Sequence, residues 1–345
     1  MAVIQDLPLE LIIRILELTV GSLITVSQQA ATRSTLAQAS LVARSWRALS
    51  QQYLASTFTV SSHDRVWMRY LEAISNASAS PSTLRCLLLV VRHASAEKLA
   101  LLQQQQVELR ELSIISHDLE LNASHTRLLG GLRRLKLLRA LKIPVSLKPA
   151  TPTMLESLFI TSDLPELPSF FLPVSTFAPR LTHLEINTSF RALGTALQRM
   201  LQPVAPQLTR LGLTFTLVRS ASPERRDTIL SSLHSFLLAC TSIKALRLHD
   251  PRPNELRHLL SLLPSRLILL DVSPLLLDHA EGMPRGAAEA FDLPCMAQLR
   301  RWRMTTECLL DDPDSAWEPL AEEQWRAACR ARGIEPRGEK RYFTD

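Results

Sequence analysis

The sequence predicts an α/β fold: a short N-terminal helical module, then an irregular solenoid with parallel strands on one face and helices on the other. Three observations lead to this prediction. An amphipathic helical segment opens the chain, a strand-like pattern recurs nine times after it, and helical segments lie between the recurrences. A chain of 345 residues has room for two or three domains or one elongated array, and it can bury a substantial core.

The segment "DLPLELIIRILEL", residues 6–18, predicts the first helix. Asp6 suits the N-cap, and Pro8 suits the first turn, where a missing N–H costs nothing. Apolar residues recur along one face at spacings of three and four: Pro8, Leu11, Ile12, Ile15 and Leu16. A second helical segment, "LAQASLVARSWRALSQQYL", begins near Leu36. Two or three short helices bury too little apolar surface to be stable alone. We therefore expect a partner or the rest of the chain to cover them.

The two helical segments together resemble the F-box motif. The family pattern begins Leu-Pro-x-Glu and ends with Leu-Val-x-x-x-Trp, and the resemblance covers roughly residues 5–54. The matching positions are Leu7, Pro8, Glu10, Leu11, Ile15, Leu41, Val42 and Trp46. Two departures are visible. Residues 21–31 look like an insertion that we expect to loop out, and Ala43 replaces a cysteine that is common near the tryptophan.

The resemblance implies a partner. In that family the F-box docks on the Skp-family linker subunit of a cullin-based ubiquitin ligase, through apolar anchors with charged groups at the rim. Carried over to this chain, the docking surface would consist of Leu7, Pro8, Leu11, Ile15, Leu41, Val42 and Trp46. The alternative is that these side chains only pack an N-terminal cap against the remainder of the protein.

The body of the chain repeats the pattern L-x-x-L-x-aliphatic, which is the strand part of a leucine-rich repeat. Successive recurrences are 23 to 35 residues apart. They begin at Leu84, Leu109, Leu132, Leu155, Leu181, Leu208, Ile243, Leu267 and Leu299. The third recurrence is ambiguous because "LRALKI", residues 138–143, competes with "LRRLKL" for the strand. The Asn or Cys usual at the ninth repeat position is absent, so we expect irregular curvature.

Helical signals separate the strands, at 95–106, 222–240 and 253–263. The sequence predicts a final helix over 317–333, and Gly333 suits the left-handed conformation that ends a helix. This helix would cover the exposed end of the repeat array. The segment "GIEPRGEKRYF" can add one last strand. The predicted organisation is therefore an F-box helical module at 1–55 and a connecting segment with the first solenoid turn at 56–80. The leucine-rich-repeat-like solenoid follows at 81–310, then a capping helix and tail at 311–345. This build resembles that of fungal F-box proteins.

Charge indicates a candidate substrate face. The chain has 39 Lys and Arg against 33 Asp and Glu, a net charge of +6. Because strand side chains alternate, the x positions of the pattern share the face opposite the leucines. The basic residues there are Arg133, Arg134, Lys136, Lys244, Arg247, Arg300, Arg301 and Arg303, interrupted by Glu111, Glu156, Glu185 and Asp271. Such a wall favours an acidic or phosphorylated segment. The alternative is solvated charge that keeps a sheet face soluble.

No motif for catalysis, phosphate binding or zinc occurs, so we predict neither an enzyme nor a bound cofactor or metal. The five cysteines are odd in number and scattered, which fits reduced thiols in an intracellular protein. We expect neither a signal peptide nor a membrane span, and a location in the cytoplasm, the nucleus or both.

These observations predict a non-catalytic substrate adaptor that joins the linker subunit, and through it a cullin ligase, to a substrate protein. Two alternatives stay open. One is a leucine-rich-repeat interaction scaffold with no connection to ubiquitin. The other is a basic groove for RNA, which lacks interleaved aromatic residues and which we do not expect.

Overall fold

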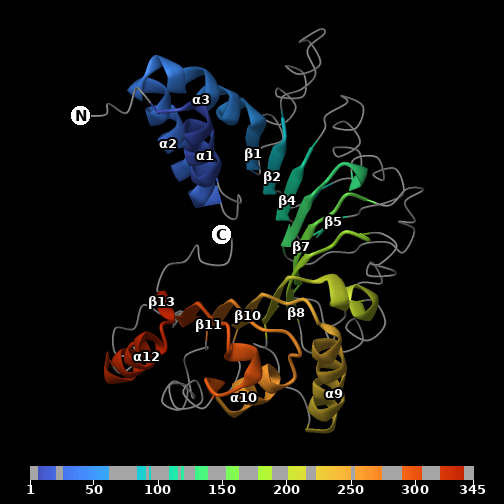
Figure 1. Cartoon of the computed structure of the whole chain (residues 1–345). Coiled ribbons are helices and arrows are strands. Elements are labelled where there is room, and N and C mark those ends of the chain that lie inside the picture. The colour runs from blue at the N-terminus through green and yellow to red at the C-terminus, as the bar shows by residue number, and fades with distance from the viewer. Residues whose placement is uncertain are drawn as a thin grey trace. The chain divides into compact units, whose positions relative to one another are not determined.

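The structure of the protein is a computed structural model. It describes residues 7–20, 26–61, 84–90, 93–94, 109–115, 118–119, 129–138, 153–162, 178–188, 201–214, 223–249, 253–273, 290–304 and 319–337. The fold is α/β with parallel strands (Figure 1). The chain forms two compact units, Met1–Leu155 and Glu156–Asp345, and each is described by itself.

Unit 1 begins with three helices, α1 (Leu9–Val20), α2 (Val26–Val42) and α3 (Arg44–Ser56). The three helices pack around a small apolar core made of Ile12, Leu16, Leu36 and Trp46. The carbonyl of Pro8 accepts hydrogen bonds from the N–H groups of Leu11 and Ile12, so this proline stands just before the helix. Asp6, predicted as the N-cap, lies outside the described residues.

Two sequence predictions about α2 are wrong. The helix begins at Val26, ten residues before the expected start, so residues 26–31 are helical and do not form a loop. The second predicted helix is in fact two. Ala43 has an extended backbone (φ −152°, ψ 157°) that ends α2 and starts α3. The polar sequence of the first turns of α2 hid its helical character, because little of that stretch is apolar and periodicity is the main signal.

The strands of unit 1 follow one another in chain order. They are β1 (Thr57–Ser61), β2 (Cys86–Val90), β4 (Glu111–Ile115) and β6 (Arg134–Leu138), and each pairs in parallel with the next. A two-stranded parallel sheet of β3 (His93–Ala94) and β5 (Asp118–Leu119) lies beyond β2 and β4. Strand β1 was not among the nine predicted strands. Strand β6 settles the ambiguous third recurrence in favour of "LRRLKL".

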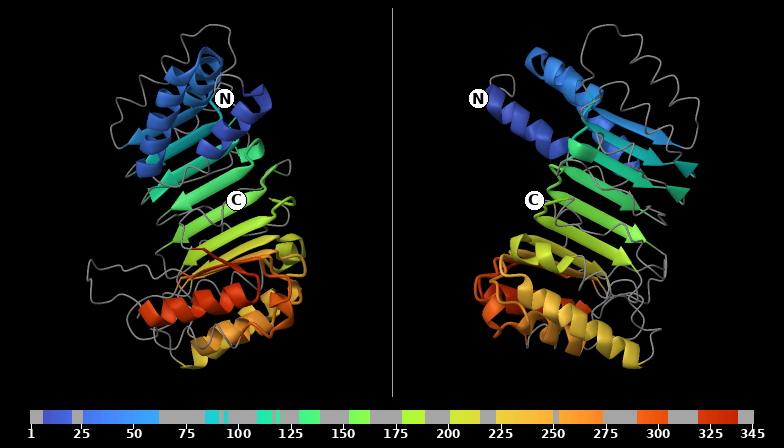
Figure 2. Two further views of the ribbon diagram at one scale, coloured as in Figure 1. Left: turned by 60° about the vertical axis from the view of Figure 1, so that its left-hand side comes forward. Right: turned by 90° about the vertical axis from the view of Figure 1, so that its right-hand side faces the viewer.

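Unit 2 continues in the same manner. Parallel pairs join β7 (Ser157–Ser162), β8 (His183–Thr188), β9 (Arg210–Thr214), β10 (Ala245–His249), β11 (Leu269–Ser273), β12 (Arg301–Met304) and β13 (Glu335–Arg337). The connections include helices α9 (Pro223–Ala239), α10 (Pro253–Ser261) and α12 (Pro319–Ala331), and 3₁₀ helices η5 (Gln202–Gln207) and η7 (Pro294–Met296). Figure 2 shows the strands side by side with helices on one side of them. Sequential neighbours of this kind are the arrangement of a repeat array.

All nine predicted recurrences are confirmed as strands with the expected interior. The first residue of every recurrence, from Leu84 to Leu299, is buried, and so is the fourth, from Leu87 to Trp302. The residue just before a strand has a recurring role at β2, β4, β7, β8, β9, β10 and β11. Its carbonyl accepts one N–H group from the residue that precedes the next strand and one from the first residue of that strand. Thr182, for example, accepts from Thr209 at 2.8 Å and from Arg210 at 3.1 Å. These bonds fix the register at the start of the strands.

The predicted helices of unit 2 are confirmed at α9, α10 and α12, with boundaries shifted by one or two residues. The predicted helix at 95–106 lies outside the described residues. Gly333 has φ +67°, and the N–H of Ile334 donates to the carbonyl of Cys329 at 2.9 Å, which is the expected left-handed cap. In the described ranges no helix combines the length and apolar character that crossing a membrane requires.

Candidate functional site

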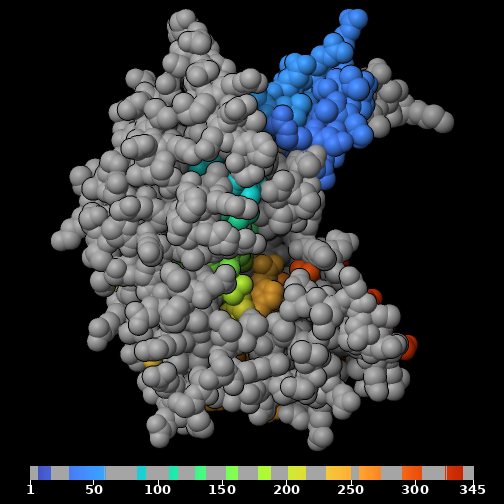
Figure 3. All heavy atoms as spheres, turned by 180° about the vertical axis from the view of Figure 1, so that it is seen from behind, coloured from blue at the N-terminus to red at the C-terminus, as the bar shows by residue number. Residues whose placement is uncertain are grey.

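The predicted linker-binding residues divide into an exposed and a buried group. Four of them are exposed: Leu11 by 50%, Ile15 by 39%, Leu41 by 77% and Val42 by 49%. Pro8 is exposed as well, and Leu7 packs partly buried against the helical core. Leu9, which the motif did not single out, is also exposed. Figure 3 shows atoms of these helices at the molecular surface.

Trp46 corrects the sequence prediction. We expected its ring on the docking surface, but it is only 8% exposed and packs with Ile12, Leu16 and Leu36. Leu49, Tyr53 and Leu54 of the same helix are partly buried against this core. The indole N–H of Trp46 has no hydrogen-bond partner among the residues that the structure describes. Trp46 therefore stabilises the helices that carry the exposed residues, and does not itself offer a contact.

The second candidate region lies on the strands of unit 2. Register pairing puts Glu185 beside Gly212, Gly212 beside Arg247, Arg247 beside Asp271, and Asp271 beside Arg303. All five occupy the same position of the repeated pattern, between two buried apolar residues. Because side chains alternate along a strand, the four charged side chains lie on the face opposite the apolar core.

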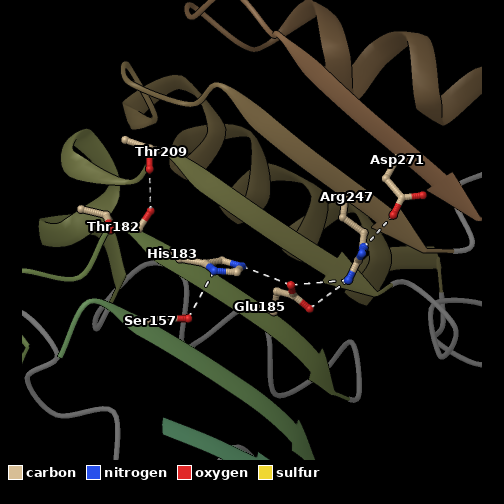
Figure 4. Close-up of polar contacts among 7 residues, drawn as sticks. All are labelled: Ser157, Thr182, His183, Glu185, Thr209, Arg247 and Asp271. Atoms are coloured by element: carbon tan, nitrogen blue, oxygen red, sulfur yellow. Dashed lines mark hydrogen bonds and ion pairs between the residues drawn. The ribbon is translucent and has the colours of Figure 1, made fainter. Parts of the chain in front are cut away.

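The four charged residues form an ion-pair ladder across these strands. Figure 4 shows three of them, Glu185, Arg247 and Asp271. Arg247 donates from Nε to Oδ2 of Asp271 at 2.8 Å and from Nη1 to Oε2 of Glu185 at 3.3 Å. Nη1 of Arg303 lies 3.6 Å from the same Asp271 oxygen. Opposite charges thus alternate from β8 to β12, and the two carboxylates balance the two guanidinium groups.

The end of the ladder on β11 and β12 is almost inaccessible to solvent. Asp271 is 1% exposed and Arg303 is 4% exposed, although both are charged. Oδ1 of Asp271 and Nε of Arg303 have no hydrogen-bond partner within the described part of the chain. Buried charges are costly to leave unpaired, so each arginine and each carboxylate of the ladder depends on its neighbour.

The ladder corrects the predicted basic face. Arg247 and Arg303 are neutralised by Asp271 and Glu185 and are not open to a ligand. Arg134 pairs with Glu111 at 2.9 Å, and Arg301 lies 3.5 Å from Glu335. Of the other predicted residues, Lys136 is partly buried, whereas Arg133, Lys244 and Arg300 are exposed. The acidic residues that the sequence shows at strand positions were the signal for this pairing.

A chain of hydrogen bonds extends the ladder at β8. Nε2 of His183 lies 3.1 Å from Oε1 of Glu185, and Nδ1 of His183 lies 3.2 Å from Oγ of Ser157 (Figure 4). The order serine, histidine, carboxylate is that of an activated nucleophile. Glu185, however, also binds Arg247, and β8 uses its backbone N–H groups in pairing with β7 and β9. The described residues of β8 therefore offer no pair of free donors for an oxyanion.

The described cysteines are all free thiols. Burial raises the pKa of Cys240 and Cys329 to about 12 and that of Cys295 to about 11. Burial, reinforced by the charge of Glu111, raises the pKa of Cys86 to about 12 against the opposing effect of Arg134 and Arg110. Burial also raises the pKa of Glu111, against Arg134. In the described residues no three His, Cys, Asp or Glu side chains gather as metal ligands.

Comparison with known proteins adds no identification. No protein-family model matches this chain, and no curated protein sequence matches it.

Proposed function

We propose that this protein is a non-catalytic, intracellular substrate adaptor of a cullin-based ubiquitin ligase. The N-terminal module, α1 to α3, is an F-box that binds the Skp-family linker subunit. The strands that follow form a leucine-rich-repeat-like solenoid that binds the substrate protein. The mechanism is effective concentration, because holding a substrate near the ubiquitin-charged enzyme makes an otherwise rare encounter frequent.

The single observation that carries this proposal is the exposure of apolar side chains on the N-terminal module. Leu9, Leu11 and Ile15 on α1 and Leu41 and Val42 at the end of α2 are exposed in the chain alone. We call these five residues the apolar surface of the module. A soluble protein seldom exposes so many large apolar side chains within three short helices unless another protein covers them. Four of the five also match the F-box pattern.

The burial of Trp46 supports the same proposal in a different way. Ile12, Leu16, Leu36 and Trp46 form the core of the module, so the exposed residues are not needed to hold the helices together. The alternative scaffold function, in which the module is only a cap, requires the body of the chain to cover Leu11, Ile15 and Leu41. Their exposure favours the adaptor.

The test is co-expression with a Skp-family linker subunit, followed by size-exclusion chromatography and titration calorimetry. We expect a one-to-one complex with the wild-type chain. The double variant Leu11→Asp/Leu41→Asp places two charges on the apolar surface and should weaken binding at least about 100-fold, since central apolar anchors carry most of the affinity. Trp46 is left unchanged, because altering it would damage the fold of the module.

Leu238 provides the matched control. It is an exposed leucine on α9, 49% accessible, outside the module. Leu238→Asp should leave linker binding within about twofold of the wild type, since it lies in the other unit. If a folded wild-type chain does not bind the linker subunit, the adaptor proposal fails and the repeat scaffold takes its place.

A further inference from the structure

Two histidines from different helices meet on the helical side of unit 2. His234 lies on α9 and His258 on α10, and both helices lie on the same side of the strands (Figure 1). The centroids of their rings are 6.1 Å apart, with an angle of 66° between the ring planes. His234 is half-buried and His258 is exposed. We call these two residues the histidine pair.

The apolar faces of the two helices hold the histidine pair in place. Buried apolar residues flank each histidine along its helix. They are Leu233, Phe236 and Leu237 on α9 and Leu256, Leu259 and Leu260 on α10. These residues fix the rotation of each helix about its axis, so the two imidazoles lie close together without needing contacts of their own. A site on rigid helices keeps its geometry better than one on loops.

Neither ring of the histidine pair has a hydrogen-bond or ion-pair partner among the residues that the structure describes. A neutral imidazole has one nitrogen with a free lone pair, which it can donate to a metal ion. His183 is different, because its two ring nitrogens already lie 3.2 Å from Oγ of Ser157 and 3.1 Å from Oε1 of Glu185. The histidine pair is therefore available for a ligand.

We propose that the histidine pair binds a divalent transition-metal ion such as Zn²⁺, with both imidazoles as ligands and water in the remaining positions. A zinc ion lies about 2 Å from an imidazole nitrogen and therefore about 3 Å from the ring centroid. Two imidazoles on one tetrahedral ion then have centroids about 5 Å apart. The observed separation of 6.1 Å exceeds this by about 1 Å, which rotation of the exposed His258 side chain can supply.

The ligand types favour a transition metal over Mg²⁺ or Ca²⁺. Imidazole nitrogen suits Zn²⁺, Cu²⁺ and Ni²⁺, whereas Mg²⁺ and Ca²⁺ prefer oxygen ligands. In the described residues no third His, Cys, Asp or Glu completes a group around the pair. Structural zinc sites have four protein ligands, so this site is an open one. We expect the ion to join α9 to α10 and to bind more weakly than it does in a structural zinc site.

This inference goes beyond the proposed function and does not depend on it, since neither a linker subunit nor a substrate takes part. Sequence motifs could not indicate the site, because the two histidines are 24 residues apart and lie on separate helices. Zinc motifs are recognised by ligands only a few residues apart. The packing of α9 and α10 is what brings this pair together.

The first test is calorimetric titration of Zn²⁺ into the full-length protein, with Mg²⁺ as the negative probe. The test variants are His234→Phe and His258→Phe. Phenylalanine keeps an aromatic ring and its edge-to-face contact, but it has no nitrogen to donate to a metal. His249→Gln is the control, because it removes a histidine from strand β10 and not from either helix. Circular dichroism checks that each variant folds.

A second test needs no variant, and it decides the question even if a substitution prevents folding. Diethyl pyrocarbonate modifies accessible imidazole nitrogens, and peptide mass spectrometry identifies the modified histidines. Zn²⁺ should slow the modification of both His234 and His258, because a nitrogen bound to a metal has no free lone pair. The modification of His249 should not change.

We expect each phenylalanine variant to bind Zn²⁺ at least about tenfold more weakly than the wild type, since altering even the residues that orient metal ligands costs this much. The control should bind as the wild type does, and Mg²⁺ should not bind. A loss in only one phenylalanine variant would mean that the rings do not share an ion, and would overturn the proposal. So would unchanged affinity in both, an equal loss in the control, no protection of the pair, or no binding of Zn²⁺ by the wild-type chain.

Discussion

The side chain of Glu185 occupies the space above Gly212 on the neighbouring strand. A Cβ atom added to Gly212 would lie only 2.7 Å from Cγ of Glu185 and 3.3 Å from its Cδ. Because position 212 has no side chain, Glu185 reaches across β9 and meets Arg247 on β10. The glycine thus explains how an ion pair can form between strands that are not direct neighbours.

Gly212→Ala should destabilise the protein by about 1–3 kcal/mol, since inserting a methyl group into a packed site displaces its neighbours. Glu185 must move, and its contact with Arg247 is lost with it. The measurement is the free energy of unfolding from urea denaturation. Gly130→Ala is the control, because nothing lies within 4 Å of a Cβ at Gly130. Equal effects of the two substitutions would contradict this account of the glycine.

Asp271→Ala should cost about 3–5 kcal/mol, because it leaves Arg303 and Arg247 without their shared carboxylate in a buried place. The control is Glu335→Ala. Glu335 lies 3.5 Å from Arg301, and both side chains are well exposed. That substitution should change stability by no more than about 1 kcal/mol, as surface pairs do. Replacing both partners, as in Asp271→Leu/Arg303→Met, should recover most of the loss, and an unchanged loss would argue against charge as the cause.

Trp46→Ala should destabilise the N-terminal module by about 3–5 kcal/mol, the usual cost of removing a buried tryptophan. Leu41→Ala should stay within about 0.5 kcal/mol, because Leu41 is exposed in the chain alone. Amide hydrogen exchange over α1 to α3 measures both effects locally. The opposite ranking would place Trp46 on the surface and Leu41 in the core, against the packing found here.

Because the thiols of Cys240 and Cys329 are buried, we expect the free energy of unfolding to fall at alkaline pH. The pKa of Cys240 and that of Cys329 rise from an ordinary value of 9.0 to about 12 on folding. Between pH 9 and pH 12 the unfolded chain loses these protons and the folded chain keeps them, so the free energy of unfolding decreases as pH rises. Each thiol contributes at most about 1.4 kcal/mol per pH unit.

Urea denaturation between pH 8 and pH 10.5 checks this dependence. The variant Cys240→Ala/Cys329→Ala should lose stability less steeply than the wild type over that interval. Iodoacetamide at pH 8 should label neither cysteine in the native protein and both after unfolding, with the labelled sites identified by peptide mass spectrometry. Rapid labelling of native Cys240 would show that its thiol is accessible, contrary to the structure.

The strand pattern was predictable because burial and chain geometry impose it directly. Leu184, Leu211, Leu246 and Leu270 each occupy the fourth position of a recurrence, and each is buried. A residue at that position has to face the core, whichever strand lies beside it, so local sequence is enough. Gly333 was predictable for a similar reason, since a left-handed cap favours one residue type.

The helical module was less predictable. The early start of α2 and its end at Val42 depend on how three helices pack around Trp46, and periodicity in a polar segment carries little of that information. The sequence also did not determine which side of each helix is buried. Leu11 and Ile12 are adjacent and both apolar, yet only Ile12 is in the core.

The sequence by itself determined the α/β class, the nine recurrences with their buried leucines, and the presence of basic residues at strand positions. Only the tertiary structure decided which of those basic residues form ion pairs with acidic residues of neighbouring strands. Arg247 and Arg303 become internal partners of Glu185 and Asp271 because parallel register brings residues 24 to 62 positions apart onto one line. Pairing of this kind depends on which strands become neighbours, and no local pattern contains that information.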